Sequence, residues 1–259
     1  MKKIQISILS ILFIVPFTSY ALNVSSYSFN YQNADTLYIN DLAQKGLDLS
    51  NELTFEAWIK LDSFEMNPFQ HIVAKRVGIG DQRSYDFYLY FNEGNPVMVL
   101  ETQLDGFVPG CAVTVPWAPE LYTWHHVAVS KSGTSVQFYV DGKPQGDVQA
   151  CFGAHIYDGS APFEIGGLSY ESWYFDGNID EVRVWNIART EAEIFKRYHR
   201  ELPSNERSGL VGYWMLNGVY TDASGNDNTL ASNSLNNFST DVPHISCLKD
   251  RGRNPACEF

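Results

Sequence analysis

The chain has 259 residues, of which 44% are hydrophobic and 14% aromatic, with 30 acidic and 18 basic side chains. A hydrophobic share near the average of globular domains excludes a multi-span membrane protein and an intrinsically disordered chain. The formal net charge of −12, without a basic cluster, argues against nucleic acid and anionic membrane surfaces as partners. The length suits one all-β domain or two small ones.

Residues 1–21 have the pattern of a cleaved signal peptide. Two lysines follow the initial methionine, an apolar stretch covers residues 4–17, and Ser19 and Ala21 are the small residues of a cleavage site. A membrane anchor is the alternative, but this stretch is shorter than the roughly 20 residues that span a bilayer. We therefore expect cleavage after Ala21, export to the periplasm or the extracellular space, and no membrane insertion.

The four cysteines of an exported chain are expected to form disulfides, for which three pairings exist. Their spacing favours Cys111–Cys151 within the domain and Cys247–Cys257 as the closure of a tail over residues 241–259. Thiolate metal binding is the alternative, but no C-x-x-C pair or neighbouring histidine supports it.

Short runs of alternating apolar and polar residues predict β-strands along most of the chain. Residues 53–61 place Leu53, Phe55 and Ile59 on one face of a half-buried strand. Further strands are predicted at 84–91, 97–100, 124–129, 136–140, 163–167 and 182–185. The dipeptide Asp141-Gly142 predicts a two-residue hairpin turn with positive φ.

One segment is predicted to be helical. Thr190 and Glu193 form a capping box, Ile194, Phe195 and Tyr198 recur on one helical face, and Pro203 ends the run. Many short strands, one late helix and no β-α-β alternation indicate an all-β, two-sheet antiparallel sandwich with one short C-terminal helix.

Three motifs in this order resemble laminin-G-like, concanavalin A-like jelly-roll domains over about residues 27–200. They are the strand at 53–60, the hairpin with W-H-H-V-A at 124–128 and Y-V-D-G at 139–142, and the strand G-N-I-D-E-V-R-V-W-N at 177–186. The resemblance implies a jelly-roll sandwich with a helix after its last strand motif.

Residues 209–232 resemble the opening of such a module, although they lie near the C-terminus. They are either the closing strands of the one sandwich or the start of a truncated second repeat. Because so short a piece cannot bury a core alone, we expect closing strands within a jelly-roll domain of residues 22–240.

The chain shows no motif for catalysis. The paired carboxylates of a glycosidase strand, a Gly-x-Ser-x-Gly elbow, a His-Glu-x-x-His helix and a phosphate loop are all missing from the sequence. Asp180 and Glu181 are neighbours that we expect on opposite strand faces, and His125 and His126 diverge in the same way. We therefore expect a non-enzyme.

Calcium is the cofactor that the sequence favours, as one structural Ca²⁺. A strand beginning near Asp180 places its carboxylate on one face with Val182 and Val184, where it is costly unless paired or bound to a metal. Oxygen ligands of the type that calcium prefers recur in the Asp-x-Ser-Gly-Asn loop, and the resemblance implies calcium near these elements. The proposed ligands are Asp35, Asp180, Asp222, Ser224, Asn226 and Asn228. Ordinary Asx turns are the alternative.

Aromatic side chains in or beside predicted loops are candidates for ligand contact, although loop aromatics also cap cores. They are Trp117, Tyr122, Tyr170, Trp173 and Tyr174. A rigid sandwich that presents such loops favours a secreted, carbohydrate-binding module, with a glycan as partner. A module that binds an extracellular protein or has a structural role in the envelope is the alternative, and an enzyme acting on polysaccharides is a third.

Overall fold

The computed structural model describes residues 23–64, 67–78, 82–92, 94–105, 108–234 and 237–244. The expected signal peptide and the expected Cys247–Cys257 disulfide lie outside these residues, and the domain bounds 22–240 and the tail 241–259 stay predictions.

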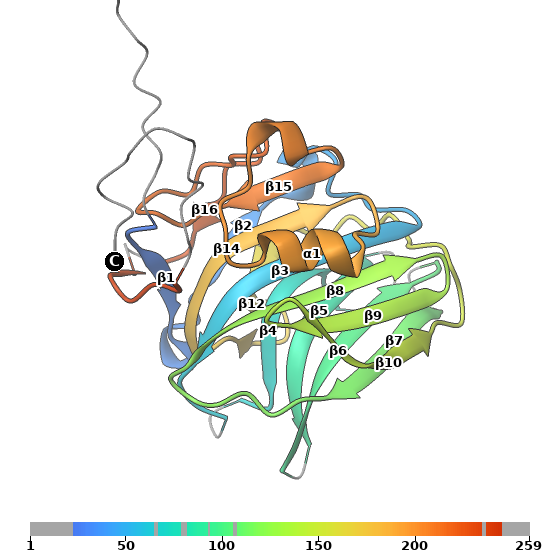
Figure 1. Ribbon diagram of the computed structural model, residues 1–259, viewed down its shortest axis with the longest axis horizontal. Helices are drawn as coiled ribbons and strands as arrows, with labels where there is room; N and C mark the ends of the chain where they lie inside the picture. Colours follow the sequence, from blue (N-terminus) through green and yellow to red (C-terminus); the bar gives the residue numbers. More distant parts are fainter. Residues whose placement is uncertain are drawn as a thin grey trace, which may run out of the picture.

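Two antiparallel sheets, A and B, pack face to face (Figure 1). The order in sheet A is β10 (Lys143–Ala150), β9 (Ser135–Val140), β8 (Trp124–Ser132), β3 (Glu52–Leu61), β14 (Gly177–Trp185), β1 (Ser26–Phe29) and β17 (Phe238–Ser239), with β15 (Leu210–Trp214) also paired to β14. The order in sheet B is β16 (Ala231–Ser232), β2 (Leu37–Ile39), β11 (Phe163–Ile165), β4 (Phe69–Arg76), β5 (Arg83–Asn92), β6 (Asn95–Gln103) and β7 (Pro109–Pro116).

Smaller elements complete the described fold. These are the hairpin of β12 (Gly167–Leu168) and β13 (Trp173–Tyr174), the helix α1 (Glu191–Arg197), and single 3-10 turns at Tyr31–Asn33, Asp41–Ala43 and Ser204–Glu206. The predicted two-sheet antiparallel sandwich with a short C-terminal helix is confirmed.

The core lies between the sheets and follows the alternation seen in the sequence. Leu53, Phe55 and Ile59 of β3 are almost fully buried, and the ring of Phe55 lies 5.1 Å from that of Tyr85 and 6.4 Å from that of Phe87. Burying each such side chain contributes roughly 1.5–3 kcal/mol. The core therefore fixes which residues of β5 face outward.

Residues 209–232 contribute to both sheets of this sandwich. Strand β15 pairs with β14, and β16 pairs with β2. The buried ring of Trp214 stacks on Phe163 at 5.1 Å, inside the shared core.

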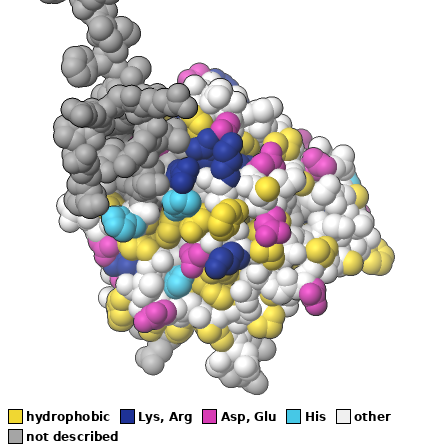
Figure 2. Space-filling model, in the orientation of Figure 1, with side chains coloured by type: hydrophobic (Ala, Val, Ile, Leu, Met, Phe, Trp, Pro, Cys, Tyr) yellow, Lys and Arg dark blue, Asp and Glu magenta, His cyan; other side chains and the backbone are white. Residues whose placement is uncertain are grey.

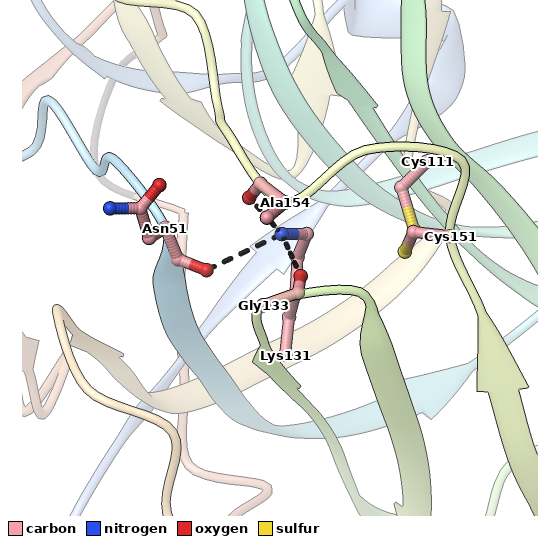
Figure 3. The surroundings of a disulfide bond; sticks show 6 residues. All are labelled: Asn51, Cys111, Lys131, Gly133, Cys151 and Ala154. Atoms are coloured by element: carbon pink, nitrogen blue, oxygen red, sulfur yellow. Dashed lines mark hydrogen bonds between the residues drawn. A yellow bond between two sulfur atoms is a disulfide. The ribbon is translucent and has the colours of Figure 1, made fainter.

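A disulfide joins the two sheets at one edge of the sandwich. Cys111 lies in β7 and Cys151 directly follows β10, with 4.6 Å between their Cα atoms (Figure 3). This confirms the predicted Cys111–Cys151 pairing. Beside it, the buried Lys131 donates to the carbonyls of Gly133 and Ala154, which holds the segment after Cys151.

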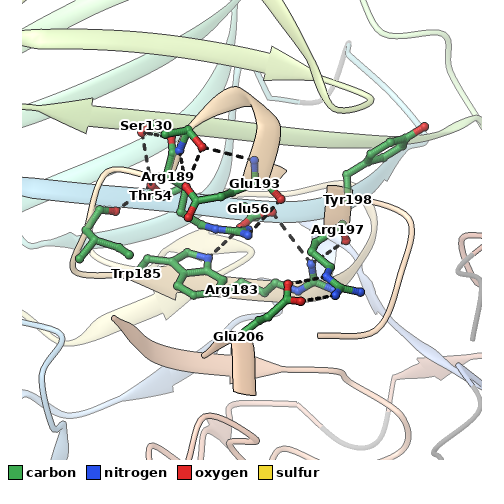
Figure 4. Close-up of polar contacts among 12 residues, drawn as sticks. Thr54, Glu56, Ser130, Arg183, Trp185, Arg189, Glu193, Arg197, Tyr198 and Glu206 are labelled. Carbon is green, nitrogen blue, oxygen red and sulfur yellow. Dashed lines mark hydrogen bonds and ion pairs between the residues drawn. The ribbon is translucent and has the colours of Figure 1, made fainter. Parts of the chain in front are cut away.

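Helix α1 lies across the outer face of sheet A (Figure 1) and has the predicted capping box. Beneath it, the buried Glu56 accepts hydrogen bonds from Arg189 at 2.6 Å and from Trp185 at 2.7 Å (Figure 4). Burial alone would raise the pKa of Glu56, but the charge of Arg189, the adjacent His126 ring and the charge of Arg183 hold it well below its usual range. This ionic network attaches the helix to the sheet.

A β-bulge in β14 overturns two predictions about the carboxylates there. Asp180 pairs with Trp58 and Arg183 with Glu56, so three steps on β14 match two on β3, and Glu181 has a φ of 51°. The bulge turns Val182 and Val184 into the core and leaves Asp180 on the outer side with Arg183. The prediction that Asp180 shares a face with the two valines is therefore wrong. Glu181 bonds to Arg183 and Tyr213 on that same outer side, so the prediction of opposite faces is wrong too.

Candidate functional site

The outer face of sheet B carries a group of aromatic side chains that the alternation places there. Phe87 and Leu89 of β5 lie in the core, so Tyr88 and Tyr90 point to the other side. Strand β4 places Phe69 opposite Tyr90 and His71 opposite Tyr88. Both pairs are therefore cross-strand neighbours on one face.

The hairpin β12–β13 adds a fifth ring to this group. The Trp173 ring lies 4.2 Å from Phe69, tilted by 22°, and 5.7 Å from His71, tilted by 7°. Phe69 in turn stacks on Tyr90 at 4.7 Å, and His71 on Tyr88 at 4.8 Å. We call this set, Phe69, His71, Tyr88, Tyr90 and Trp173, the aromatic ladder.

The aromatic ladder is partly open to solvent. Trp173, Phe69 and Tyr90 are half-buried, whereas His71 and Tyr88 are buried beneath them. Because one face of the Trp173 ring is covered by Phe69 and His71, its exposed part points away from the sheet.

Charged groups adjoin the aromatic ladder on the same face. Arg76 donates to Glu101 at 2.7 Å and to Asp86 at 3.3 Å, and its Nε lies 3.8 Å from Glu171. His71 Nδ1 lies 2.8 Å from Asp86, so the charged groups and the rings form one continuous network. A small hollow lined by Arg76, Asp86 and Glu101, among others, lies at this end.

Some buried atoms of this network have no hydrogen-bond partner within the described residues. They are His71 Nε2, Arg76 Nε and Glu171 Oε2. Burial raises the pKa of Glu171 above its usual range, although Arg76 and Arg83 act against the rise. Polar atoms left without partners in this way are ones that a ligand or a water can satisfy.

The structure separates the five aromatic residues predicted to contact a ligand. Trp173, Tyr174 and Tyr170 all belong to the β12–β13 hairpin, where Tyr170 is 67% exposed and Tyr174 is nearly buried. Trp117 instead packs against the core, edge-on to His125 at 5.4 Å, and the exposed Tyr122 bonds through its backbone to Leu61.

Sequence reasoning missed the other rings of the aromatic ladder. The alternation of the 84–91 strand places Tyr88 and Tyr90 on one face with Asp86, but the opposite face carries Tyr85, Phe87 and Phe91, so the alternation alone does not tell which aromatic face is outside. Phe69 and His71 required the register between β4 and β5, which is interrupted by a bulge between His71 and Val73.

Four of the predicted calcium ligands meet in one loop, where they bind to each other and to the backbone. Asp222 accepts from the backbone N–H groups of Tyr213, Ser224 and Asn228 and from the Ser224 hydroxyl. The amide of Asn228 donates to the carbonyls of Lys45 and Val211, and its oxygen accepts from the N–H of Lys45. These contacts are those of Asx turns that fasten the loop to β15.

The other two predicted ligands lie elsewhere. Asp180 accepts from Asn23 and from the Glu181 N–H, while Asp35 accepts from the Asn30 N–H and from Asn237. Over the described ranges, no group of three or more His, Cys, Asp or Glu is placed to hold a metal ion. The six residues do not fit one calcium site.

A second hollow of about 420 Å³ lies between α1 and the segment 204–208. Its charged side chains already have partners: Arg189 binds Glu56 (Figure 4) and lies over the Trp185 ring, and Lys196 binds Glu206. These contacts hold α1 and the segment 204–208 together, so the hollow has a structural role. The aromatic ladder is therefore the stronger candidate site.

Comparison with known proteins connects this fold to a family. The model described as the Concanavalin A-like lectin/glucanases superfamily, of laminin G type, matches residues 31–195. Usherin from Mus musculus is 23% identical over 159 residues, which are 60% of this chain and 3% of Usherin.

Two solved structures show the same fold. A Bacteroides ovatus protein proposed to bind carbohydrate superposes with a TM-score of 0.61 at 20% identity, covering 83% of this chain and 59% of that one. A SAP-like pentraxin from Limulus polyphemus superposes with a TM-score of 0.50 at 18% identity, covering 68% of this chain and 82% of that one. At these identities the likeness concerns the fold alone. Within the described residues, no helix has the length and apolar character needed to cross a bilayer.

Proposed function

The chain belongs to the laminin-G-type family of the Concanavalin A-like lectin/glucanases superfamily, and from this premise we propose that it is a secreted, non-catalytic module that binds a glycan. The observation that supports this proposal is the half-exposed aromatic ladder next to carboxylates. An aromatic ring offers an apolar surface to the C–H face of a sugar. Carboxylates accept hydrogen bonds from sugar hydroxyls.

The carboxylates of this face do not have the arrangement of a glycosidase. Asp86 and Glu101 face each other across β5 and β6, but Arg76 binds both of them. A glycosidase needs one carboxyl free to donate a proton and the other free to attack or to activate water. We therefore propose binding without turnover.

Export agrees with the rest of the proposal, since a disulfide in a small domain forms and persists in an oxidising compartment. The mass of the protein recovered from the periplasm or the medium tests this part. Removal of residues 1–21 is expected to leave a chain that begins with Leu22, and a full-length mass contradicts it.

Replacement of Trp173 tests the site. Trp173→Ala removes a partly exposed ring of the stacking surface and is expected to weaken glycan binding by at least about tenfold, which corresponds to about 1.4 kcal/mol. Trp173→Phe keeps an aromatic face and is expected to retain most of the affinity. Calorimetric titration with glycans that score on an array measures both variants.

The control is Phe195→Ala, which removes an aromatic side chain that is 52% exposed and belongs to α1, on the outer face of sheet A. Its affinity is expected to equal that of the unmodified protein. Unchanged affinity in Trp173→Ala, or an array without any glycan signal, contradicts the proposal and favours a module that binds protein.

A further inference from the structure

Resting on the proposed function, we propose that the aromatic ladder binds neutral glycans and that the carboxylates around it exclude glycans bearing uronate, sialate or sulfate groups. The proposal concerns the outer face of sheet B only. Three observations on this face support it: the signs of the charged side chains, the ion pairs that these side chains already form, and the polar atoms that lack a hydrogen-bond partner.

Acidic groups outnumber basic ones around the aromatic ladder. Asp86, Glu101 and Glu171 adjoin the rings, and Glu164 lies next to them on β11, opposite Ala74. Glu164 accepts from the Ser169 N–H and hydroxyl, and Arg76 is the cation that contacts the other three. An anionic sugar group entering this face would meet mostly negative charge.

Arg76, the cation in contact with these carboxylates, is poorly placed to receive an anion. It bonds to both Asp86 and Glu101 through Nη1, and its side chain is only 12% exposed. Arg83 donates its Nε to the carbonyl of Gly78. Bidentate recognition of a carboxylate or sulfate needs an arginine fork that is not already occupied.

The Glu171 carboxylate is suited to accept hydrogen bonds from a ligand. Its side chain is partly exposed two residues before Trp173 on the same hairpin, and its Oε2 has no hydrogen-bond partner within the described residues. The Nε2 of His71 also lacks a partner there, but His71 is buried beneath the Trp173 ring and is not open to a ligand. Sugar hydroxyls donate hydrogen bonds, whereas ionised carboxylates and sulfates do not.

Basic side chains are available on a different face. Figure 2 shows the side of the molecule that carries α1, where basic side chains gather beside a band of hydrophobic ones. Arg200, three residues after the end of α1, has an exposed side chain. A polyanion attracted to this protein is therefore expected to bind at the α1 face, away from the aromatic ladder. Single substitutions on each face can show which of the two faces a given ligand binds.

The test is a quantitative binding series with neutral plant and fungal oligosaccharides, polygalacturonate fragments, sialylated oligosaccharides and heparin fragments. Binding to a neutral glycan is expected, with little change between about 50 and 200 mM salt, because no counterions are released. It is expected to fall at least about tenfold in Trp173→Ala. The acidic glycans are expected to give no signal that depends on Trp173.

Glu171→Gln tests the acceptor role, with Glu120→Gln as the matched control on an exposed surface. Loss of the charged acceptor is expected to weaken neutral-glycan binding by about tenfold, since hydrogen bonds to charged groups contribute more than neutral ones. Glu120→Gln is expected to bind as the unmodified protein does. Equal affinity in Glu171→Gln overturns the role of this carboxylate in the proposal.

The outcomes separate this inference from the proposed function. Binding of an acidic glycan that Trp173→Ala abolishes overturns the neutral preference but leaves the glycan-binding function intact. Binding of heparin that Arg200→Ala weakens and Trp173→Ala does not supports the exclusion at the aromatic ladder. A complete lack of glycan binding contradicts both.

Discussion

Asp180 is a carboxyl group without exposed surface, placed on the outer side of β14 by the bulge. Burial and the neighbouring Glu181 raise its pKa well above the usual range, because both disfavour the charged form. The Asn23 side chain beside it donates its amide to Asp180 and has a buried oxygen without a partner. The site therefore suits a neutral group that can also donate.

Asp180→Asn is expected to stabilise the protein at neutral pH by about 1–3 kcal/mol, the usual penalty of a buried group with incomplete partners. The new amide can donate to the Asn23 oxygen after that side chain flips. Because the folded pKa is raised, the folded state binds the proton more tightly than the unfolded state does. Protonation of Asp180 therefore contributes its full share of the free energy of unfolding at pH values below the unfolded pKa. This contribution is lost as the pH rises through the folded pKa.

Urea unfolding of both proteins across the acidic to neutral range measures this effect. The free energy of unfolding is expected to fall with rising pH more steeply in the unmodified protein than in Asp180→Asn. Parallel pH profiles, or a less stable variant at neutral pH, would refute a neutral Asp180.

Residue patterns predicted those features whose signal is local in the sequence. The Thr190–Glu193 capping box forms as predicted, and Asp141 and Gly142 have the φ values of 49° and 73° expected for the hairpin turn. The bulge at Glu181 was not predictable, because a non-glycine residue with positive φ does not change the alternating pattern of apolar and polar residues in the sequence. For the same reason Asp180 was assigned to the wrong face.

At the scale of elements, strands β7 and β10 form the edges of sheets B and A, and the Cys111–Cys151 disulfide joins them. The bond closes a loop with a sequence separation of 40 residues. In the chain-entropy model, such a closure contributes roughly 4 kcal/mol by restricting the unfolded chain.

The double variant Cys111→Ser and Cys151→Ser is expected to lose about 2–4 kcal/mol of unfolding free energy and to become sensitive to protease near residues 151–156. Chemical denaturation and limited proteolysis provide the measurements, with the reduced unmodified protein for comparison. A variant as stable as the oxidised protein would show that hydrogen bonds such as those of Lys131 hold the edge alone.

The loop of residues 222–228 is a second element whose role can be tested. Because Asp222 and Asn228 already bond to backbone groups, a chelator is expected to leave the melting temperature unchanged. Asp222→Ala is expected to destabilise the protein by about 1–3 kcal/mol through the N–H groups it leaves unpaired. Thermal unfolding with and without EDTA or added calcium checks both, and a calcium-dependent rise would restore the metal interpretation.

At the scale of the molecule, the sequence motifs identified the sandwich and its family, because each motif lies within one strand or hairpin. The aromatic ladder was only partly accessible to the same reasoning. Trp173 was found as a loop aromatic, but its neighbours Phe69 and His71 join it through pairing between strands distant in sequence. A site assembled from three separate segments needs the register of the whole sheet before it can be recognised.

The central claim is that the outer face of sheet B binds a glycan, with α1 and the 222–228 loop uninvolved. Amide and indole chemical-shift mapping during titration with a neutral oligosaccharide from the array tests it most directly. The account predicts shifts for the Trp173 indole and for the amides of β4 and β5, with those of residues 191–197 and 222–228 unchanged. Shifts confined to α1 or to the 222–228 loop, with Trp173 unmoved, would contradict it.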